Sequence, residues 1–313
     1  MTDARIPLLI DTDPGVDDAL ALLMAFNDPH HEVVGLTIAA GNVGLVHTVA
    51  NALKICDVVG VDTPVFAGCA SPLLHSAVDA AYVHGQDGLG DAGHPPSLRT
   101  VEAEHAALAI LRLSHAHAGR LLLVALGPLT NLAVALKLDP SLPSRIARLV
   151  VMGGAVTGHG NMTAAAEFNI GFDPEAAHIV LSSFPEFELV DWEATIAHGL
   201  PHGEVVEWLA ADSARARFFD AISRNTREWS VDRRGDDWYA ADALAMAHAL
   251  EPAGALEMTR RGLLVETEGR HSRGATVVDW RVEQANDGGN ASILLRYNRL
   301  RFQRRVKAAL AAK

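Results

Sequence analysis

Residues 6–26 read IPLLIDTDPGVDDALALLMAF, and this stretch decides the fold class. The apolar run from Ile6 to Ile10 predicts a buried β-strand. An acidic residue, a proline and two further acids then precede an apolar stretch, which predicts a helix from Pro14 to about Phe26 with Asp13 as its N-cap. A buried strand followed at once by a helix is typical of an α/β protein with parallel strands.

The same alternation continues along the chain. Short apolar runs predict strands at 32–39, 121–125, 149–152, 187–190, 276–278 and 293–297, and amphipathic stretches predict helices at 45–58, 129–138 and 300–310. No low-complexity linker divides the chain. We therefore expect one domain over residues 1–313, an α/β fold with an open, doubly wound, mostly parallel sheet.

Four of the eight residues in DTDPGVDD, 11–18, are aspartates. Crowded carboxylates repel one another and raise each other's pKa unless a cation or strong donors lie between them. Hard oxygen ligands gathered in this way suit calcium or magnesium. The alternative is a generously capped helix at a solvated edge of the sheet.

Polar residues also follow several other predicted strands. They lie in AGN at 40–42, LGPLTN at 126–131 and GGAVTGHGNMTAAAEFN at 153–169. Ligands of doubly wound sheets bind beyond the carboxyl ends of the strands, so these segments and the aspartate cluster should meet on one rim. Each Asn or Thr taken singly is equally explained as a turn or cap residue.

Charge and cysteine content restrict the partners. The formal net charge of −12 argues against nucleic acid or an anionic membrane surface as the main partner, because both are negatively charged. Two cysteines are too few for a disulfide framework, and no apolar run approaches the ~20 residues that span a bilayer. We expect a cytoplasmic protein.

Seven segments together resemble one known family, the nucleoside hydrolases, which are calcium-dependent N-ribohydrolases that include the inosine-uridine preferring enzymes. The segments follow the family order and span most of the chain up to about residue 250. They are DTDPGVDDALAL (11–22), AAGN (39–42), VHGQDGLG (83–90), ALGPLTNLA (125–133), VMGGA (151–155), EFNIGFDPEAA (167–177) and DALAMA (242–247).

The resemblance implies a Ca²⁺ cofactor and a catalytic mechanism. Asp13, Asp18, the backbone carbonyl of Thr130 and Asp242 would be the metal ligands. Asp13 would also act as general base on a calcium-bound water that attacks C1′ of the ribose. Catalytic roles are likewise implied for Asp17, Asn169 and Asp242.

The resemblance also implies a small-molecule ribonucleoside substrate and assembly into a homodimer or homotetramer. Asp17, Asn42 and Asn169 would bind the ring hydroxyls near the metal. Asn161 and Glu167 would bind the 5′-hydroxyl, and His84 would contact the substrate near the base. Carboxylates and amides offer the donors and acceptors that sugar hydroxyls need.

One position departs from part of the family. Members of the inosine-uridine preferring group have a histidine directly before the late metal aspartate, where this chain has Ala241. Trp229, Trp238 and Tyr239 lie shortly before it, in a polar stretch that predicts a mobile flap at about 223–241. Stacking on aromatic rings is another way to activate a leaving base, so we expect Trp238 to contact substrate and purines to be preferred.

Two other functions fit part of the pattern. A phosphatase of the haloacid dehalogenase class also places a DxD pair after its first strand, as in DTD at 11–13, but Pro14-Gly15 and the following acid pair are not typical of it. A non-catalytic ribose- or metal-binding protein on the same fold would explain the absence of the histidine. The retained Asp13, Asp17, Asp18, Asn169 and Asp242 favour an enzyme.

Overall fold

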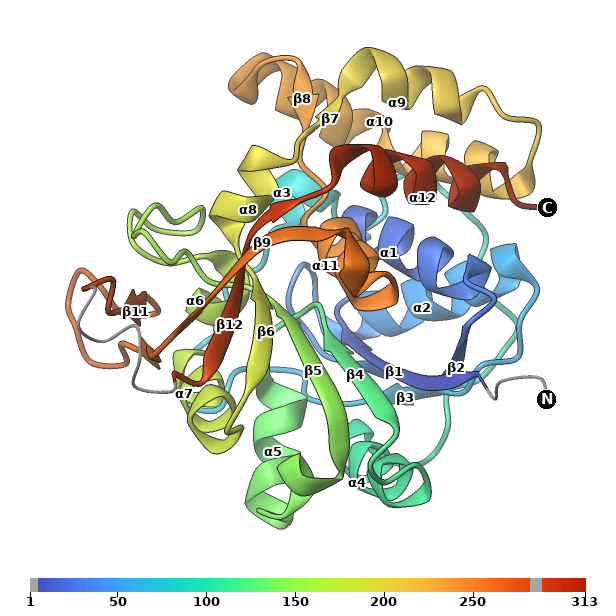
Figure 1. The fold of residues 1–313 in the computed structure, drawn as a ribbon. Coiled ribbons are helices and arrows are strands. Elements are labelled where there is room, and N and C mark those ends of the chain that lie inside the picture. The colour runs from blue at the N-terminus through green and yellow to red at the C-terminus, as the bar shows by residue number, and fades with distance from the viewer. Residues whose placement is uncertain (1–4, 282–288) are drawn as a thin grey trace.

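The computed structural model describes residues 5–281 and 289–313 and has an eight-stranded sheet at its centre (Figure 1). β12 and β9 pair antiparallel, and the other neighbouring strands of this sheet are parallel. The order is β3 (Val65–Ala67), β2 (His31–Ile38), β1 (Ile6–Thr12), β4 (Leu121–Ala125), β5 (Ile146–Met152), β6 (Phe187–Val190), β12 (Ala291–Tyr297) and β9 (Ala255–Arg261).

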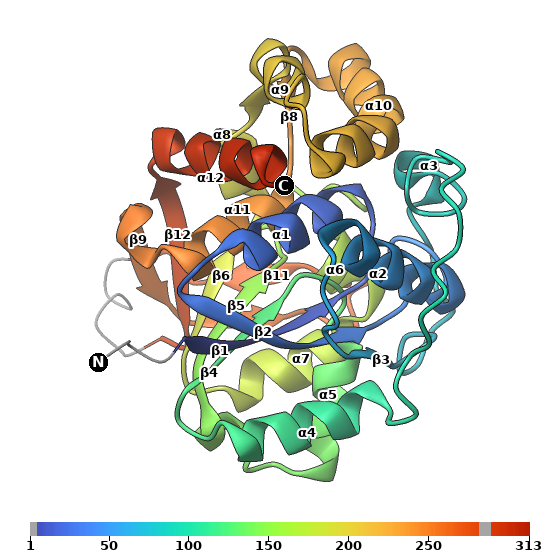
Figure 2. The same cartoon turned by 90° about the vertical axis from the view of Figure 1, so that its right-hand side faces the viewer.

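Helices cover both faces of the sheet (Figure 2). Alternate strand residues point to opposite faces, so Leu8 and Ile10 belong to one apolar core and Leu9 to the other. The first core is closed by α1 (Val16–Asn27), α2 (Leu45–Val59), α10 (Ala214–Arg234), α11 (Ala241–Leu250) and α12 (Arg299–Ala311). The second is closed by α4 (Ala106–Ala116), α5 (Thr130–Leu138) and α7 (Pro174–Ser183). The predicted single, doubly wound α/β domain is confirmed.

Short elements complete the chain. They are α3 (Ala81–His84), α6 (Phe168–Phe172), α8 (Trp192–Ala197), α9 (His202–Leu209), the 3₁₀ turns Leu142–Arg145 and Pro252–Gly254, and the small pairs β7 (Leu200–Pro201) with β8 (Asp237–Trp238) and β10 (Leu263–Val265) with β11 (Thr276–Val278). The strand predicted at 276–278 is therefore present but lies outside the main sheet.

The predicted cap of the first helix is wrong. α1 begins at Val16 with Gly15 as its N-cap, two residues later than expected. The carboxylate of Asp13 instead accepts the backbone N–H of Asn42 at 2.7 Å. Asp18 takes over the capping function, because its Oδ2 accepts the N–H of Gly15 at 2.9 Å. Asp13 therefore lies in the turn between β1 and α1 and does not cap the helix.

The stretch predicted as a flap is largely helical. Residues 223–234 form the second half of α10, and Asp237–Trp238 pair with β7 as β8. Phe218, Phe219 and Ile222 anchor the first half of α10 in the core. Movement of this stretch over a bound ligand stays a prediction.

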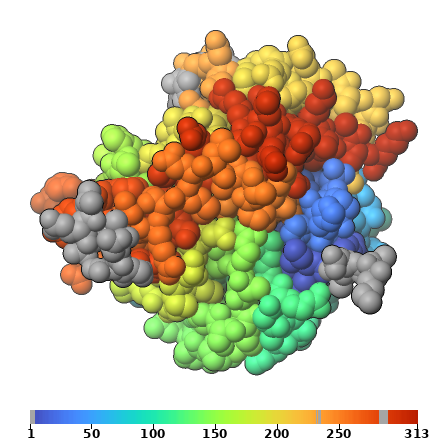
Figure 3. Space-filling model, viewed as in Figure 1, coloured from blue at the N-terminus to red at the C-terminus, as the bar shows by residue number. Residues whose placement is uncertain are grey.

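The C-terminal helix holds α1 in place. Arg305 of α12 donates to Asp28, directly after α1, and to Glu251, directly after α11, at 2.8 Å each. In the space-filling view the C-terminal segments, coloured orange to red, form a continuous band between the yellow and the green segments (Figure 3). Among the described residues, no helix is both long and apolar enough to cross a membrane.

Candidate active site

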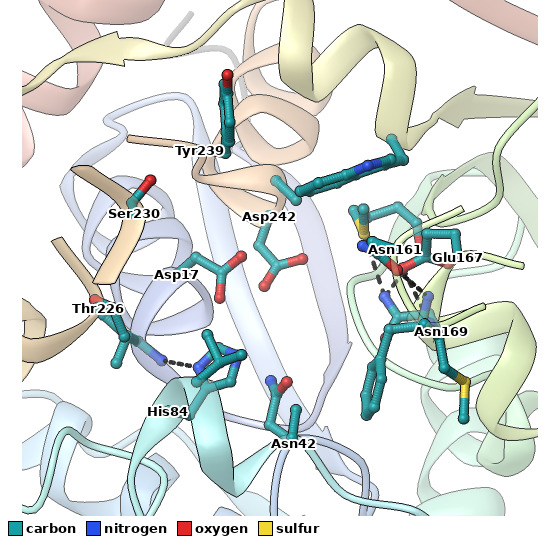
Figure 4. A pocket seen from close by; sticks show the side chains of 18 of the residues that line it. Asp17, Asn42, His84, Asn161, Glu167, Asn169, Thr226, Ser230, Tyr239 and Asp242 are labelled. Atoms are coloured by element: carbon teal, nitrogen blue, oxygen red, sulfur yellow. Dashed lines mark hydrogen bonds between the residues drawn. The ribbon is translucent and has the colours of Figure 1, made fainter. Parts of the chain in front are cut away.

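A cavity opens beyond the carboxyl ends of the central strands, where the connections from β1 and β4 leave the sheet in opposite directions. In Figure 4, Asp17 and Asp242 lie near the centre of the cavity. His84 and Asn42 lie below them, and Asn161, Glu167 and Asn169 lie to the right. The cavity lining contains these sequence-predicted residues: Asp17, Asn42, His84, Asn161, Glu167, Asn169, Trp238 and Asp242. The structure thus gathers them from across the chain.

Three carboxylates meet beside the cavity, which Asp17 and Asp242 line and which the fully buried Asp18 adjoins. Asp17, Asp18 and Asp242 each offer an oxygen within 4.8 Å of the others. Burial, followed by mutual repulsion, raises the pKa of Asp242 well above its usual range. Burial also raises the pKa of Asp17 to about 6, although the amides of Ala241 and Asp242 partly oppose this shift. Such a cluster is stable as carboxylates only with compensating positive charge.

Asp13 lies beside this cluster and is almost fully buried. Its Oδ2 accepts from Asn42, but its Oδ1 has no hydrogen-bond partner among the described residues. Burial and the charge of Asp18 raise the pKa of Asp13 well above its usual range. A buried carboxylate oxygen without a donor needs either a proton or a cation.

Two glycines enclose the Asp13 carboxylate. A Cβ on Gly127 would overlap its Oδ1, and a Cβ on Gly41 would overlap its Oδ2. Both positions therefore need glycine because of close approach and leave Asp13 no room to rotate away. The Asp13 carboxylate is held in one orientation.

Gly127→Ala should weaken metal binding by about tenfold or more, because the new methyl group must displace the Asp13 carboxylate. Calcium titration by calorimetry measures the change. Gly203→Ala is the matched control, since a Cβ there meets nothing within 4 Å. Unchanged calcium affinity in the Gly127 variant would show that Asp13 is not part of the metal site.

Asn42 connects the carboxylates of two different elements. Its side-chain Nδ2 donates to Asp18 Oδ2 at 2.9 Å and to the backbone carbonyl of Asp13 at 3.2 Å. Thr12 also donates its hydroxyl to Asp18. The arrangement of acids therefore depends on donors from β1 and from the loop after β2.

Thr130 is the residue whose backbone carbonyl the resemblance implied as a metal ligand. It is absent from the cavity lining, and its hydroxyl donates to Asp173 at 2.7 Å. Leu126, four residues earlier and directly after β4, does line the cavity. Its carbonyl accepts Nδ2 of Asn169, another lining residue, at 2.6 Å. The sequence motif did not single out this carbonyl, and the role of Thr130 stays a prediction.

Glu167 and Asn161 form the far wall. Glu167 caps α6 by accepting the N–H groups of Asn169 at 3.0 Å and Ile170 at 3.2 Å, and it also accepts that of Gly154 at 2.8 Å. Burial nevertheless raises its pKa to about 7. Asn161 Oδ1 accepts the N–H of Phe168 at 2.8 Å, so the side-chain amide nitrogen of Asn161 points away from that N–H.

His84 is held in one tautomer. Its Nδ1 accepts the backbone N–H of Val16 at 3.1 Å, so the proton of the neutral ring lies on Nε2. Burial lowers the pKa of His84 to about 4, against the opposing charge of Asp18. The neutral ring is therefore a hydrogen-bond donor at pH 7 and not a cationic acid.

Aromatic side chains form the roof. Trp192 and Tyr239 pack edge to face with ring centroids 6.0 Å apart, and Trp238 packs on Phe219 at 5.8 Å. Trp229 also lines the cavity, as does Ala241 next to Asp242. Sequence reasoning did not single out several other lining residues, among them Thr226, Ser230, Met152, Met162 and Phe168.

The donor set fits a hard divalent cation. A cluster of carboxylates, one of them with an unsatisfied oxygen, lies beside a backbone carbonyl. Among the described residues, no cysteine or histidine belongs to this cluster. Asp11, the first acid of the DxD pair, points away from the cavity to Thr37 and Asn131. A phosphatase nucleophile at Asp11 is thereby excluded.

A doubly wound sheet with clustered carboxylates and amide side chains at its switch point is typical of an α/β enzyme whose site could hold a metal ion. The family model described as inosine-uridine preferring nucleoside hydrolase matches residues 8–304. The chain belongs to this family, whose members are N-ribosyl hydrolases acting on ribonucleosides.

Relatives differ in the substrates that their names give. Uridine nucleosidase 1 of Arabidopsis thaliana is 36% identical over 266 residues, covering 84% of this chain and 79% of its own length. An inosine-guanosine nucleoside hydrolase structure superimposes with a TM-score of 0.91 at 31% identity, covering 99% of this chain and all of its own. A purine-preferring ribonucleoside hydrolase from Gardnerella vaginalis gives a TM-score of 0.88 at 30% identity, covering 97% and 98%.

Proposed function

We propose that this chain hydrolyses the N-glycosidic bond of ribonucleosides in a calcium-dependent reaction and prefers purines. The observation that carries the proposal is the unpartnered Oδ1 of Asp13 beside the buried carboxylates of Asp18 and Asp242 and the half-buried one of Asp17. Asp13, Asp18 and Asp242 would hold the ion, together with the backbone carbonyl of Thr130 or of Leu126. When bound, calcium supplies positive charge that grips vicinal sugar hydroxyls and lowers the pKa of water.

The side chains around the ion perform the remaining tasks. Asp13 accepts a proton from the attacking water. The two glycines beside its carboxylate hold it in the orientation that this step needs. Asp17, Asn42 and Asn169 hold the ribose hydroxyls on the floor of the cavity. Asn161 and Glu167 bind the 5′-hydroxyl at the far wall, which leaves the base under the aromatic roof.

The purine preference rests on the roof. Ala241 offers no proton where part of the family has a histidine, and neutral His84 is a donor only. Trp192, Trp229 and Tyr239 present a broad aromatic surface for a two-ring base. Two similar structures bear purine names, whereas the Arabidopsis relative bears the name of a uridine enzyme. We further propose that residues 223–241 move as a flap over the substrate, that the protein is cytoplasmic, and that it forms a homodimer or homotetramer.

Chelation should lower base release from ribonucleosides by at least about a hundredfold, because the buried acids then lose their compensating charge. We would measure free base from inosine, guanosine, adenosine, uridine and cytidine with and without EGTA. Excess calcium should restore the rate. Full activity in chelator would refute the metal dependence, and faster uridine than inosine cleavage would refute the purine preference.

p-Nitrophenyl riboside separates sugar chemistry from base activation, because its leaving group needs no protonation. Cleavage of this compound without cleavage of any nucleoside would assign the site an unusual base. Failure on all substrates, with calcium still bound, would favour the non-catalytic binding protein.

A further inference from the structure

Asp191 and Glu193, at the start of α8, bind the loop that carries Asn161. Glu193 Oε1 accepts both the backbone N–H of Thr157 at 2.8 Å and its hydroxyl at 2.6 Å. Oε2 of the same carboxylate accepts the N–H of Val156 at 3.0 Å, and Asp191 Oδ2 lies 3.3 Å from the same nitrogen. The oxygens of two carboxyl groups thus converge on one amide.

These hydrogen bonds belong to a series that binds successive backbone N–H groups of the loop. The N–H groups of four successive residues, 154–157, are each bound by a side chain: Gly154 by Glu167, Ala155 by Thr276, and the next two by the acid pair. Trp280 also donates to the carbonyl of Val156 at 2.9 Å. The segment leads within a few residues to Asn161 and Met162 in the cavity lining. Its position is therefore set from α8 on one side and from Glu167 on the other.

Trp192 lies between the two acids in sequence and lines the same cavity. Asp191 caps α8 by accepting the N–H of Ala194 at 2.8 Å through its Oδ1. The acid pair is thus the point where the roof residue and the loop are joined. Two carboxyl groups whose oxygens meet at one amide repel one another when both are charged, and a shared proton removes this repulsion.

We propose that Asp191 and Glu193 form a proton-sharing carboxyl pair that positions the 155–162 loop, and with it Asn161, for the 5′-hydroxyl end of the substrate. The inference rests on the proposed function in assigning Asn161 to that hydroxyl. The proton resides on Asp191. Burial and the neighbouring Glu193 raise the pKa of Asp191 to about 8, whereas for Glu193 the hydrogen bonds from Asp191 and Thr157 together outweigh burial and lower its pKa.

The proton assignment makes the two acids unequal. Asp191→Asn introduces an amide that can donate to Glu193 as the proton does, and it keeps an oxygen for the N–H of Ala194. Glu193→Gln replaces one acceptor oxygen by an NH₂ group, which faces either the Val156 N–H or the Thr157 N–H and hydroxyl, so at least one loop donor loses its acceptor. The first change should be tolerated and the second should free the loop.

The test compares inosine with 5′-deoxyinosine in the calcium-loaded enzyme. Glu193→Gln should lower kcat/KM for inosine by about tenfold, mainly through KM, and change that for 5′-deoxyinosine by less than about twofold. Asp191→Asn should remain near the wild type with both. Glu207→Gln, an exposed acid on α9, is the matched control.

Equal losses on both substrates, or equal losses in the two acid variants, would overturn the positioning role. Thr157→Val removes one hydrogen bond from the loop side and keeps the test open should Glu193→Gln fail to fold. Deuterium exchange of a peptide covering 154–166 should accelerate in Glu193→Gln and not in Asp191→Asn; unchanged exchange would also overturn the proposal. This readout needs no turnover, so inactivity of the wild type would refute only the proposed function.

Discussion

Asp13→Asn should lower kcat for ribonucleoside hydrolysis by about 10³-fold, within the range for a positioned general base. The amide keeps the size of the side chain and can still accept the Asn42 N–H through one oxygen. It cannot take a proton from water, and it removes one negative charge from the carboxylate group. Both kcat and calcium affinity should therefore fall, whereas an effect confined to KM would contradict the assignment.

Steady-state base release and calorimetric calcium titration measure the two effects separately. Asp57→Asn is the control, because Asp57 is an exposed acid on α2 and its replacement changes the net charge equally. Saturating calcium should restore occupancy in the Asp13 variant without restoring kcat. Recovery of the full rate would limit Asp13 to metal binding.

Inosine should exceed 2′-deoxyinosine in kcat/KM by about 10⁴-fold, the range seen when a site is built to bind a hydroxyl group that the analogue lacks. Asp17, Asn42 and Asn169 all line the cavity, and loss of the hydroxyl leaves polar groups of the lining unpaired. The loss should appear in kcat as well as in KM.

The comparison is repeated with uridine and 2′-deoxyuridine, because a sugar-based preference must be independent of the base. Ratios within about tenfold for either pair would refute the assignment of these three side chains to the ribose. A large ratio for one base only would place the discrimination at the roof of the cavity instead.

The sheet could be predicted because its central strands are apolar throughout. LLLVA at 121–125 became β4 with unchanged ends, and the strand predicted at 187–190 became β6. The start of α1 could not be placed from local signals, because the Asp13 carboxylate binds a backbone amide 29 residues away. Cap preferences describe only what a side chain can do within its own turn.

Backbone carbonyls are also hard to place from sequence. Thr130 was the implied carbonyl ligand, and the structure additionally offers the carbonyl of Leu126 beside the cavity. Which carbonyl faces a cavity depends on the turn after β4, and side-chain identity does not report it. The polar residues of 223–241 predicted a mobile flap, which stays a prediction, but they did not indicate the 21-residue helix that Phe218, Phe219 and Ile222 anchor just upstream.

Three of the five tryptophans of the chain, Trp192, Trp229 and Trp238, line one cavity. The intrinsic fluorescence of the protein is therefore dominated by indoles at the place where a base would bind. Occupancy of the site can be followed optically in the unlabelled protein, in stopped-flow as well as at equilibrium. The aromatic roof is thus also a built-in spectroscopic reporter, with Trp208 and Trp280 as its background.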